Sequence, residues 1–127
     1  MIRFVHCVKR RPEVLLEDFR AFWTGQAFNR LLEELALQTG ALRWQTSLTL
    51  NIDANLQLMA ERGSGEPFDA MLEIWWDRAR ELQDLGADPE IRRLQQAIED
   101  SQAPFVDFRQ SRRFFTDCDE PDTSVAF

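Results

Sequence analysis

The segment from Phe68 to Asp77 constrains the fold more than any other part of this chain, because it reads as a β-strand that is apolar on both faces. Successive side chains of a strand point to opposite faces of its sheet. One face would present Ala70, Leu72, Ile74 and Trp76, and the other Met71, Glu73 and Trp75. A sheet that contains this strand therefore needs cover on both sides.

The hydrophobic pattern elsewhere predicts three more strands and two main helical regions. The predicted strands cover 2–9, 41–51 and 105–116. Helical spacing covers 14–38, which Gly25 would kink or divide, and a region after Asp77 that Gly86 breaks. A short helix is also expected over 53–62. The order β-α-β-β-α-β is that of a ferredoxin-like α+β fold, a four-stranded antiparallel sheet with its helices on one face.

The second face of this sheet leads us to expect a homodimer. In a monomer the face without helices should be polar. Here it would carry Met71, Trp75 and one of the neighbouring residues Phe114 and Phe115. A tryptophan buries roughly 150–250 Å², so the apolar patch would exceed what soluble monomers usually expose. A second copy packed face to face, as a dimeric α+β barrel, would cover it; a flap formed by residues 52–66 is the alternative.

The net charge argues against polyanionic partners. The 127 residues include 15 basic and 22 acidic side chains, a net charge of −7. A chain with this balance and no basic stripe is not expected to bind nucleic acid or an anionic membrane. No apolar run approaches the ~20 residues of a membrane span, and no secretory signal is recognisable. The expected location is therefore cytoplasmic.

No motif indicates a metal or a cofactor. Cys7, Cys118 and the single histidine lack the spacing of metal ligands. No glycine-rich loop follows a strand, and no serine stands in a nucleophile elbow, which disfavours nucleotide-dependent and serine-hydrolase chemistry.

Glu73 and His6 are the candidate catalytic residues. Glu73 interrupts an apolar strand, where desolvation is expected to raise its pKa towards the range of general acid–base catalysis. The alternative is an ion pair across the dimer with Arg43 or Arg113. His6 would form an acid–base couple with Glu73 if both share a face, and would be a hydrogen-bonded core imidazole if it points to the helices.

Five further residues are candidates for ligand binding: Trp75, Met71, Gln26, Arg43 and Arg113. Trp75 and Met71 suit a flat apolar ligand, since binding cavities are mostly apolar with a few polar anchors. Dimer packing explains these two residues equally well. Gln26 can orient a ligand because it donates and accepts hydrogen bonds without titrating, or it is simply a solvated helix residue.

An ordered set of short motifs resembles the EthD-domain family of the dimeric α+β barrel superfamily. The motifs are Lys9-Arg10-Arg11-Pro12, Glu17-Asp18-Phe19-Arg20-Ala21-Phe22-Trp23, Ala60-Glu61-Arg62-Gly63, Glu66-Pro67-Phe68-Asp69, Leu72-Glu73-Ile74-Trp75-Trp76-Asp77, Phe105-Val106-Asp107 and Ser111-Arg112-Arg113-Phe114-Phe115. The resemblance implies an EthD-like dimeric barrel domain over residues 1–117, followed by an acidic C-terminal tail over 118–127. Family members commonly carry a His-Ala-Pro-like triplet after the tryptophan that corresponds to Trp23, whereas this chain has Gln26 or Ala27 at the histidine position.

The resemblance implies several roles without choosing one. Relatives include a component of an ether-degrading system that also uses a cytochrome P450, small dehydratases and tailoring enzymes of aromatic polyketides. One hypothesis is a cofactor-independent enzyme that acts on a small aromatic or alicyclic compound as a dehydratase, isomerase or oxygenase. A second is a non-catalytic ligand-binding or auxiliary dimer that lacks the family histidine. A third is a structural dimer whose interior is filled by its own side chains.

Overall fold

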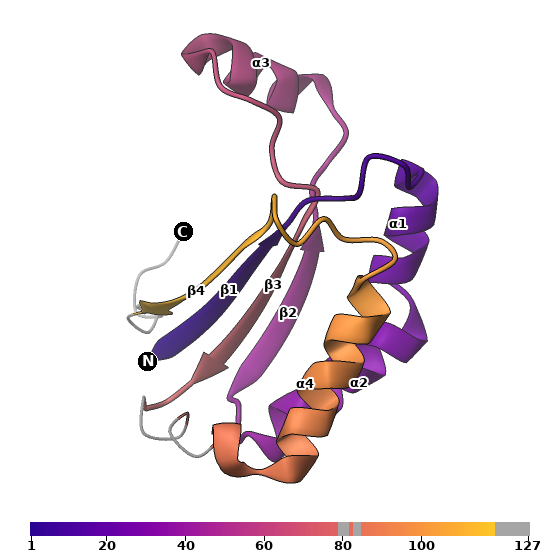
Figure 1. Ribbon diagram of the computed structural model, residues 1–127. Helices are drawn as coiled ribbons and strands as arrows, with labels where there is room; N and C mark the ends of the chain where they lie inside the picture. The colour runs from indigo at the N-terminus through magenta and orange to yellow at the C-terminus, as the bar shows by residue number, and fades with distance from the viewer. Residues whose placement is uncertain (79–81, 83–84, 119–127) are drawn as a thin grey trace.

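The computed structural model, which describes residues 1–78, 82 and 85–118, places one layer of helices against a four-stranded antiparallel sheet (Figure 1). The strands are β1 (Ile2–Val8), β2 (Arg43–Leu48), β3 (Ala70–Trp76) and β4 (Arg112–Asp117). The helices are α1 (Leu16–Trp23), α2 (Gln26–Gln38), α3 (Asp53–Arg62), the short 3₁₀ helix η2 (Leu85–Ala87) and α4 (Pro89–Gln102). The strand order β2-β3-β1-β4 confirms the predicted ferredoxin-like α+β fold.

Strand register divides the side chains of the sheet between two faces. Phe4 pairs with Ile74 on one side and with Phe115 on the other, and all three belong to the side that packs against the helices, here called the helix face. Val5 pairs with Glu73 and with Phe114, and these lie on the opposite side, here called the open face. Phe114 and Phe115 therefore point to opposite faces, as the sequence predicts.

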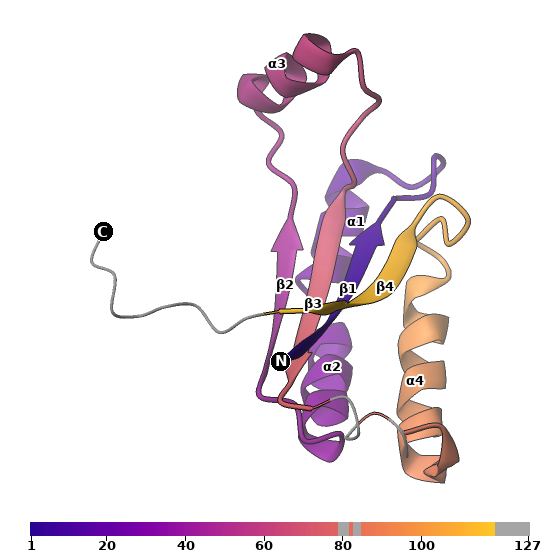
Figure 2. The same cartoon turned by 90° about the vertical axis from the view of Figure 1, so that its left-hand side faces the viewer.

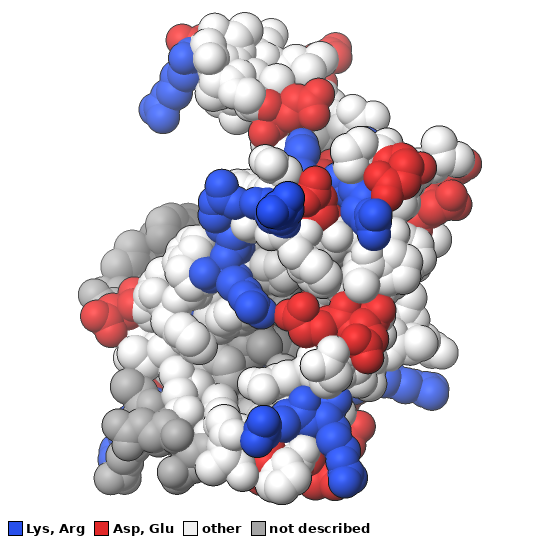
Figure 3. All heavy atoms as spheres, viewed as in Figure 1, with Lys and Arg blue, Asp and Glu red and all other residues white. Residues whose placement is uncertain are grey.

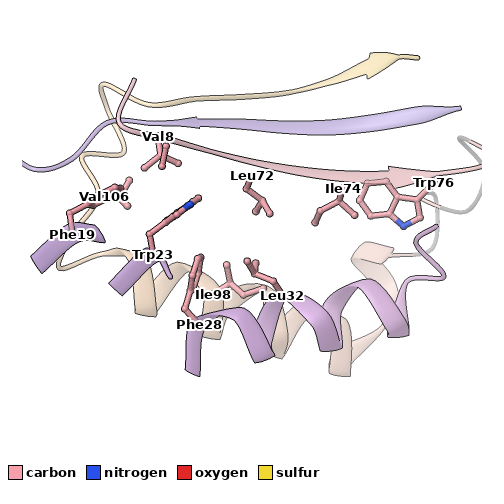
Figure 4. Packing of buried hydrophobic residues seen from close by; sticks show 11 residues of the cluster. Val8, Phe19, Trp23, Phe28, Leu32, Leu72, Ile74, Trp76, Ile98 and Val106 are labelled. Atoms are coloured by element: carbon pink, nitrogen blue, oxygen red, sulfur yellow. The ribbon is translucent and has the colours of Figure 1, made fainter. Parts of the chain in front are cut away.

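The hydrophobic core fills the space between the helix face and the helices. Side chains from β1 and β3 point towards those of α1, α2 and α4 (Figure 4). Trp23 is 1% exposed and stacks on Phe19 with 5.9 Å between the ring centroids. At the far end of the core, Trp76 Nε1 donates to Thr39 Oγ1 over 3.1 Å. The apolar stripes of the helices and the inward-facing residues of the strands thus form one core between helices and sheet.

The predicted helix over 14–38 is divided at Gly25, in agreement with the sequence. Gly25 is the N-cap of α2, and a Cβ placed on it would lie 3.1 Å from the carbonyl oxygens of Ala21 and Phe22. Glycine thus permits the sharp junction between α1 and α2. The start of α4 is also as expected, because Asp88 Oδ1 accepts a hydrogen bond of 2.9 Å from the backbone N–H of Glu90 and Pro89 occupies the first turn.

Helix α3 extends beyond the end of the strands instead of covering the open face (Figures 1 and 2). None of its residues is buried, and Leu56 and Leu58 are 61% and 62% exposed. The alternative in which residues 52–66 form a flap over the second face is therefore wrong. The helix itself is present where it was predicted, over 53–62.

The predicted fourth strand over 105–116 is too long at its start. Residues 105–111 form turns, in which the Asp107 carbonyl oxygen accepts hydrogen bonds from the backbone N–H groups of Gln110 and Ser111. Only Val106 makes an isolated bridge, to Arg10, before β4 begins at Arg112. Of the predicted tail, residues 119–127 lie outside the described residues, as do 79–81, 83 and 84 of the helical region expected after Asp77.

A pair of substitutions on α2 tests the assignment of the core. Leu32 is fully buried whereas Leu37, on the same helix, is 75% exposed. Leu32→Ala is expected to lower the free energy of unfolding by about 2–5 kcal/mol, because it leaves a cavity in a packed core. Leu37→Ala is expected to change it by less than about 0.5 kcal/mol. Urea unfolding measures both, and equal effects would contradict this packing.

Candidate functional site

The main cavity of the described residues lies between the helix face of the sheet, α2 and α4, and has a volume of about 580 Å³. Its apolar walls come from three strands and both helices: Phe4, Leu32, Leu35, Leu72, Ile74, Trp76, Ile98 and Phe115. Its buried polar side chains are His6, Thr39 and Gln102. Exposed or partly exposed polar residues line its open side: Arg92, Gln95, Gln96, Glu99 and Arg113. Apolar walls with polar anchoring groups are the usual form of a small-molecule site.

Secondary-structure periodicity places two of these polar groups, His6 and Gln102, on facing walls. On β1, Phe4, His6 and Val8 alternate with the residues of the open face, so His6 points to the helices. On α4, the buried residues Ile91, Leu94, Ile98 and Gln102 recur at helical spacing. Gln102 therefore continues the inward stripe of α4, on the side of the cavity opposite to the sheet.

His6 is the only histidine of the chain and is held as a neutral imidazole. The residue is 6% exposed, and burial followed by the nearby positive charge of Arg113 lowers its pKa from 6.5 to about 4. Both causes disfavour the imidazolium. No other described residue forms a hydrogen bond with its ring nitrogens, so they are available to a ligand.

Arg113 and Glu99 form an ion pair at the rim, where β4 approaches α4. The Arg113 Nη1 atom lies 2.9 Å from Glu99 Oε1. Both residues, together with His6, line the main cavity and a smaller one of about 90 Å³. On this side of the molecule, acidic and basic side chains are interspersed instead of forming one patch (Figure 3). Arg113 thus lines the main cavity, and its carboxylate partner within the chain is Glu99 and not Glu73.

Glu73 lies on the open face, away from the main cavity, so the alternative in which His6 and Glu73 form an acid–base couple is wrong. Its register partner on β1 is Val5, whereas His6 pairs with Leu72 on the other face. Glu73 Oε2 lies 3.2 Å from Arg3 Nη1, and Arg3 also donates from Nε to Thr116 Oγ1 over 3.3 Å. The structural reading of Glu73 as an arginine partner is therefore supported, with Arg3 of the same chain in place of Arg43 or Arg113.

The candidates Trp75, Met71 and Arg43 also lie on the open face and do not line the main cavity. The Arg43 guanidinium lies 4.1 Å from the centroid of the Trp75 ring, a cation–π contact. Trp75 is only 4% exposed in the single chain. The expectation that Trp75 would be open to water is therefore wrong, although Met71 remains partly exposed and Phe114 is 47% exposed.

Gln26 is an exposed residue at the start of α2 and lines none of the described cavities. The reading as a solvated helix residue is the one that the structure supports. Conversely, sequence reasoning missed Gln102, Thr39 and Glu99 as site residues. For Gln102 the signal was present, because it follows Ile98 by four residues on the apolar stripe of α4.

Two kinds of feature are absent from the described residues. Within these residues, no cluster of three or more His, Cys, Asp or Glu side chains is arranged to hold a metal ion. No helix in the same part of the chain combines the length and the hydropathy needed to cross a bilayer.

Comparisons with known proteins support the fold. A dimeric protein of unknown function with a ferredoxin-like fold from Bacteroides fragilis aligns over 92% of this chain and 95% of its own, with a TM-score of 0.60 and 14% identity. SnoaB, a cofactor-independent oxygenase from Streptomyces nogalater whose structure was solved for a mutant, aligns over 96% of both chains, with a TM-score of 0.55 and 13% identity. No family model and no curated protein matches the sequence. At these identities the similarity shows the ferredoxin-like fold of the chain.

The low pKa of His6 makes a prediction about stability at acidic pH. The unfolded chain binds a proton at His6 below about pH 6.5, whereas the folded chain does so only below about pH 4. This contribution to stability is therefore fully present above pH 6.5 and is lost as the pH falls towards 4. Between pH 7 and pH 5 the wild type should lose about 2 kcal/mol more unfolding free energy than His6→Gln, which keeps every carboxylate and arginine.

Urea unfolding at the two pH values measures this difference, and parallel losses in the two proteins would contradict the burial of a neutral imidazole. Because the chain has a single histidine, its NMR resonance is an independent control. The resonance should titrate near pH 4 in the wild type, and at higher pH in Arg113→Met, in which the ion pair with Glu99 is also absent.

Proposed function

We propose that the protein is a cofactor-independent enzyme that binds a small aromatic or alicyclic compound in the cavity between the sheet and helices α2 and α4. The observation that carries this proposal is the neutral imidazole of His6, which stands among apolar rings in a chamber of about 580 Å³. The chamber has room for a ligand of two or three fused rings. The aromatic side chains of Phe4, Trp76 and Phe115 offer surfaces for such rings.

The chemistry that these residues support begins with transfer of a proton from the ligand to His6. A neutral imidazole can accept a proton from an acidic O–H or C–H group. Its low basicity is offset if negative charge is stabilised as it forms on the ligand, and the guanidinium of Arg113 lies on the same cavity. The resulting anion can expel a neighbouring hydroxyl group as water once that group is protonated, return the proton at another carbon, or pass electrons to O₂. Dehydratase, isomerase and oxygenase reactions share this first step.

Two independent similarities support this reading. The resemblance to the EthD-domain family supports assignment of residues 1–117 to an EthD-like domain with degradative or tailoring roles. A structural neighbour is a cofactor-independent oxygenase. The domain boundary at residue 117 and the cytoplasmic location stay predictions from the sequence.

A second candidate function is a non-catalytic ligand-binding or auxiliary protein. The exposed Gln26 favours it, because neither Gln26 nor Ala27 at the family histidine position supplies a titrating group. In this reading the cavity holds the compound and another protein transforms it.

Turnover of simple aromatic and alicyclic compounds tests the choice between the two. We expect the wild type to accelerate conversion, or proton exchange with D₂O, for at least one of 2-naphthol, 2-tetralone and 1,2-dihydroxytetralin. In His6→Gln the rate should fall by about 10²–10⁴, the usual contribution of a general base. Mass spectrometry and oxygen uptake measure the products, with Gln26→Ala as the control that keeps activity. Binding without turnover would support the auxiliary function, and absence of binding would refute both.

We also propose that the working form is a homodimer joined through the open faces of the two sheets. Phe114 and Met71 present apolar surface there. The neighbour from Bacteroides fragilis is described as dimeric. In this arrangement the open face serves association, while the helix face holds the ligand.

The mass in solution tests the dimer. Sedimentation equilibrium at micromolar concentration should give twice the 14.9 kDa of the chain. Phe114→Asp should shift the mass towards the monomer, because it buries a charge in the apolar interface. Leu37→Asp, on an exposed position of α2, should leave the dimer intact. A monomeric wild type at this concentration would contradict the proposed interface.

A further inference from the structure

Residues 49–68, called the arm here, comprise helix α3 and the two segments that join it to β2 and β3, and they expose several large apolar side chains. No residue of α3 is buried. Soluble monomers seldom expose a cluster of such side chains, so a patch of this kind indicates an interface. The exposed fractions lie between 38% and 62% for Leu50, Ile52, Leu56, Leu58 and Phe68.

Helix α3 lacks the packing that usually stabilises a helix of its length. It has ten residues, and isolated helices shorter than about 12–15 residues are marginal in water, because most helical stability in proteins comes from packing of an apolar side. Leu56 and Met59 line a cavity of about 190 Å³ beside the other segments of the arm. Leu58, two positions further along the helix than Leu56, points to a different side. Contact with another surface would supply the missing packing.

Polar contacts at the base hold the arm in a fixed direction. The backbone N–H of Thr49 donates to the Asp69 carbonyl oxygen over 3.0 Å, which joins the two ends of the arm. Lys9 Nζ donates to Glu66 Oε2 and to the Pro67 carbonyl oxygen, each over 3.3 Å. The arm is thus tied to the end of β1, and a preformed segment loses little conformational entropy when it docks.

The arm projects on the side where the second subunit of the proposed homodimer would lie. In Figure 1, α1, α2 and α4 stand on one side of the strands, whereas α3 lies on the other side of the strand ends. Figure 2 looks onto the open face and shows α3 beyond the ends of β2 and β3. The arm therefore leaves its own open face uncovered and lies beside the space that a second copy on that face would fill.

The charge of the arm favours a protein surface over a membrane. From residue 49 to residue 60, Asp53 is the only charged side chain. Helices that bind anionic lipid carry several Lys and Arg residues on their polar side, and the basic residue of α3 is Arg62 in its last turn. Depletion of charge around apolar side chains is instead typical of the buried part of a protein–protein interface.

We propose that the arm is a clasp that packs against the partner subunit, with its exposed leucines buried at the margin of the dimer interface. This inference rests on the proposed homodimer joined through the open faces. By the two-fold symmetry of such a dimer, each subunit gives one arm and receives one. The open faces associate the subunits, and the arms add apolar area at the edge of the interface.

Matched pairs of leucine substitutions test the clasp. Leu56→Ser/Leu58→Ser should raise the Kd of the dimer by about tenfold or more, because a tenfold change corresponds to less than the burial of one leucine from each arm. The control Leu15→Ser/Leu37→Ser removes two leucines of the helix layer that are 61% and 75% exposed and should leave the Kd unchanged. Sedimentation over a dilution series measures both.

Hydrogen exchange of backbone amides gives a second readout. In the wild type, the amides of α3 should exchange about tenfold faster or more when the protein is diluted well below its Kd, because the helix then loses its packing. The amides of α2 should keep their protection, since this helix buries Phe28, Leu32 and Ala36 in the core of its own subunit.

The possible results separate the clasp from the proposed homodimer. A dimeric wild type whose Kd is unchanged in Leu56→Ser/Leu58→Ser would overturn the clasp and assign the apolar patch to a different partner, while leaving the dimer through the open faces intact. Exchange of α3 that does not depend on dilution would also overturn the clasp alone. A wild type that stays monomeric at micromolar concentration would overturn both proposals.

Discussion

The alternation of side chains along β1 and β3 is the constraint on which the rest of this structure depends. Register places His6 beside Leu72 on the helix face and Val5 beside Glu73 on the open face. A side chain cannot cross the backbone of a strand, so a shift of one residue would exchange the two sets completely. The sheet consequently separates two chemistries: an imidazole in a cavity on one side, and an arginine–carboxylate pair on the other.

Helix α4 forms the wall of the cavity that faces the sheet, because its buried residues recur at helical spacing and therefore all point towards the core. Ile91, Leu94 and Ile98 anchor the helix through buried contacts. Gln102 occupies the next inward position, and the following residues turn away through hydrogen bonds from the backbone N–H groups of Phe105 and Val106 to its carbonyl oxygen. The backbone carbonyl of Gln102 is thus engaged while its side-chain oxygen is not.

The sequence was sufficient for the fold because strand alternation and helix periodicity are local patterns with large energetic consequences. The same patterns also contained the position of His6: it has the parity of Phe4 and Val8, which fixes it on the helix face. The pairing of Glu73 was harder to predict. Arg3 lies opposite Trp75 in the strand register, so its side chain must reach diagonally from β1 to β3 to contact Glu73. Such pairings depend on the rotamers of long side chains, and the pattern of apolar and polar residues along a strand does not specify these rotamers. The cover that Arg43 provides for Trp75 was missed for the same reason.

Neutrality of His6 and the unpaired oxygen of Gln102 have a common physical origin. Both groups are removed from water by the same apolar walls, which disfavour a charge on the imidazole and leave the amide oxygen without a solvent donor. Desolvation by the same walls also acts on a ligand, because a carboxylate would lose its hydration there whereas a neutral compound has no charge to desolvate. The walls that keep His6 uncharged therefore favour a neutral compound over an acidic one.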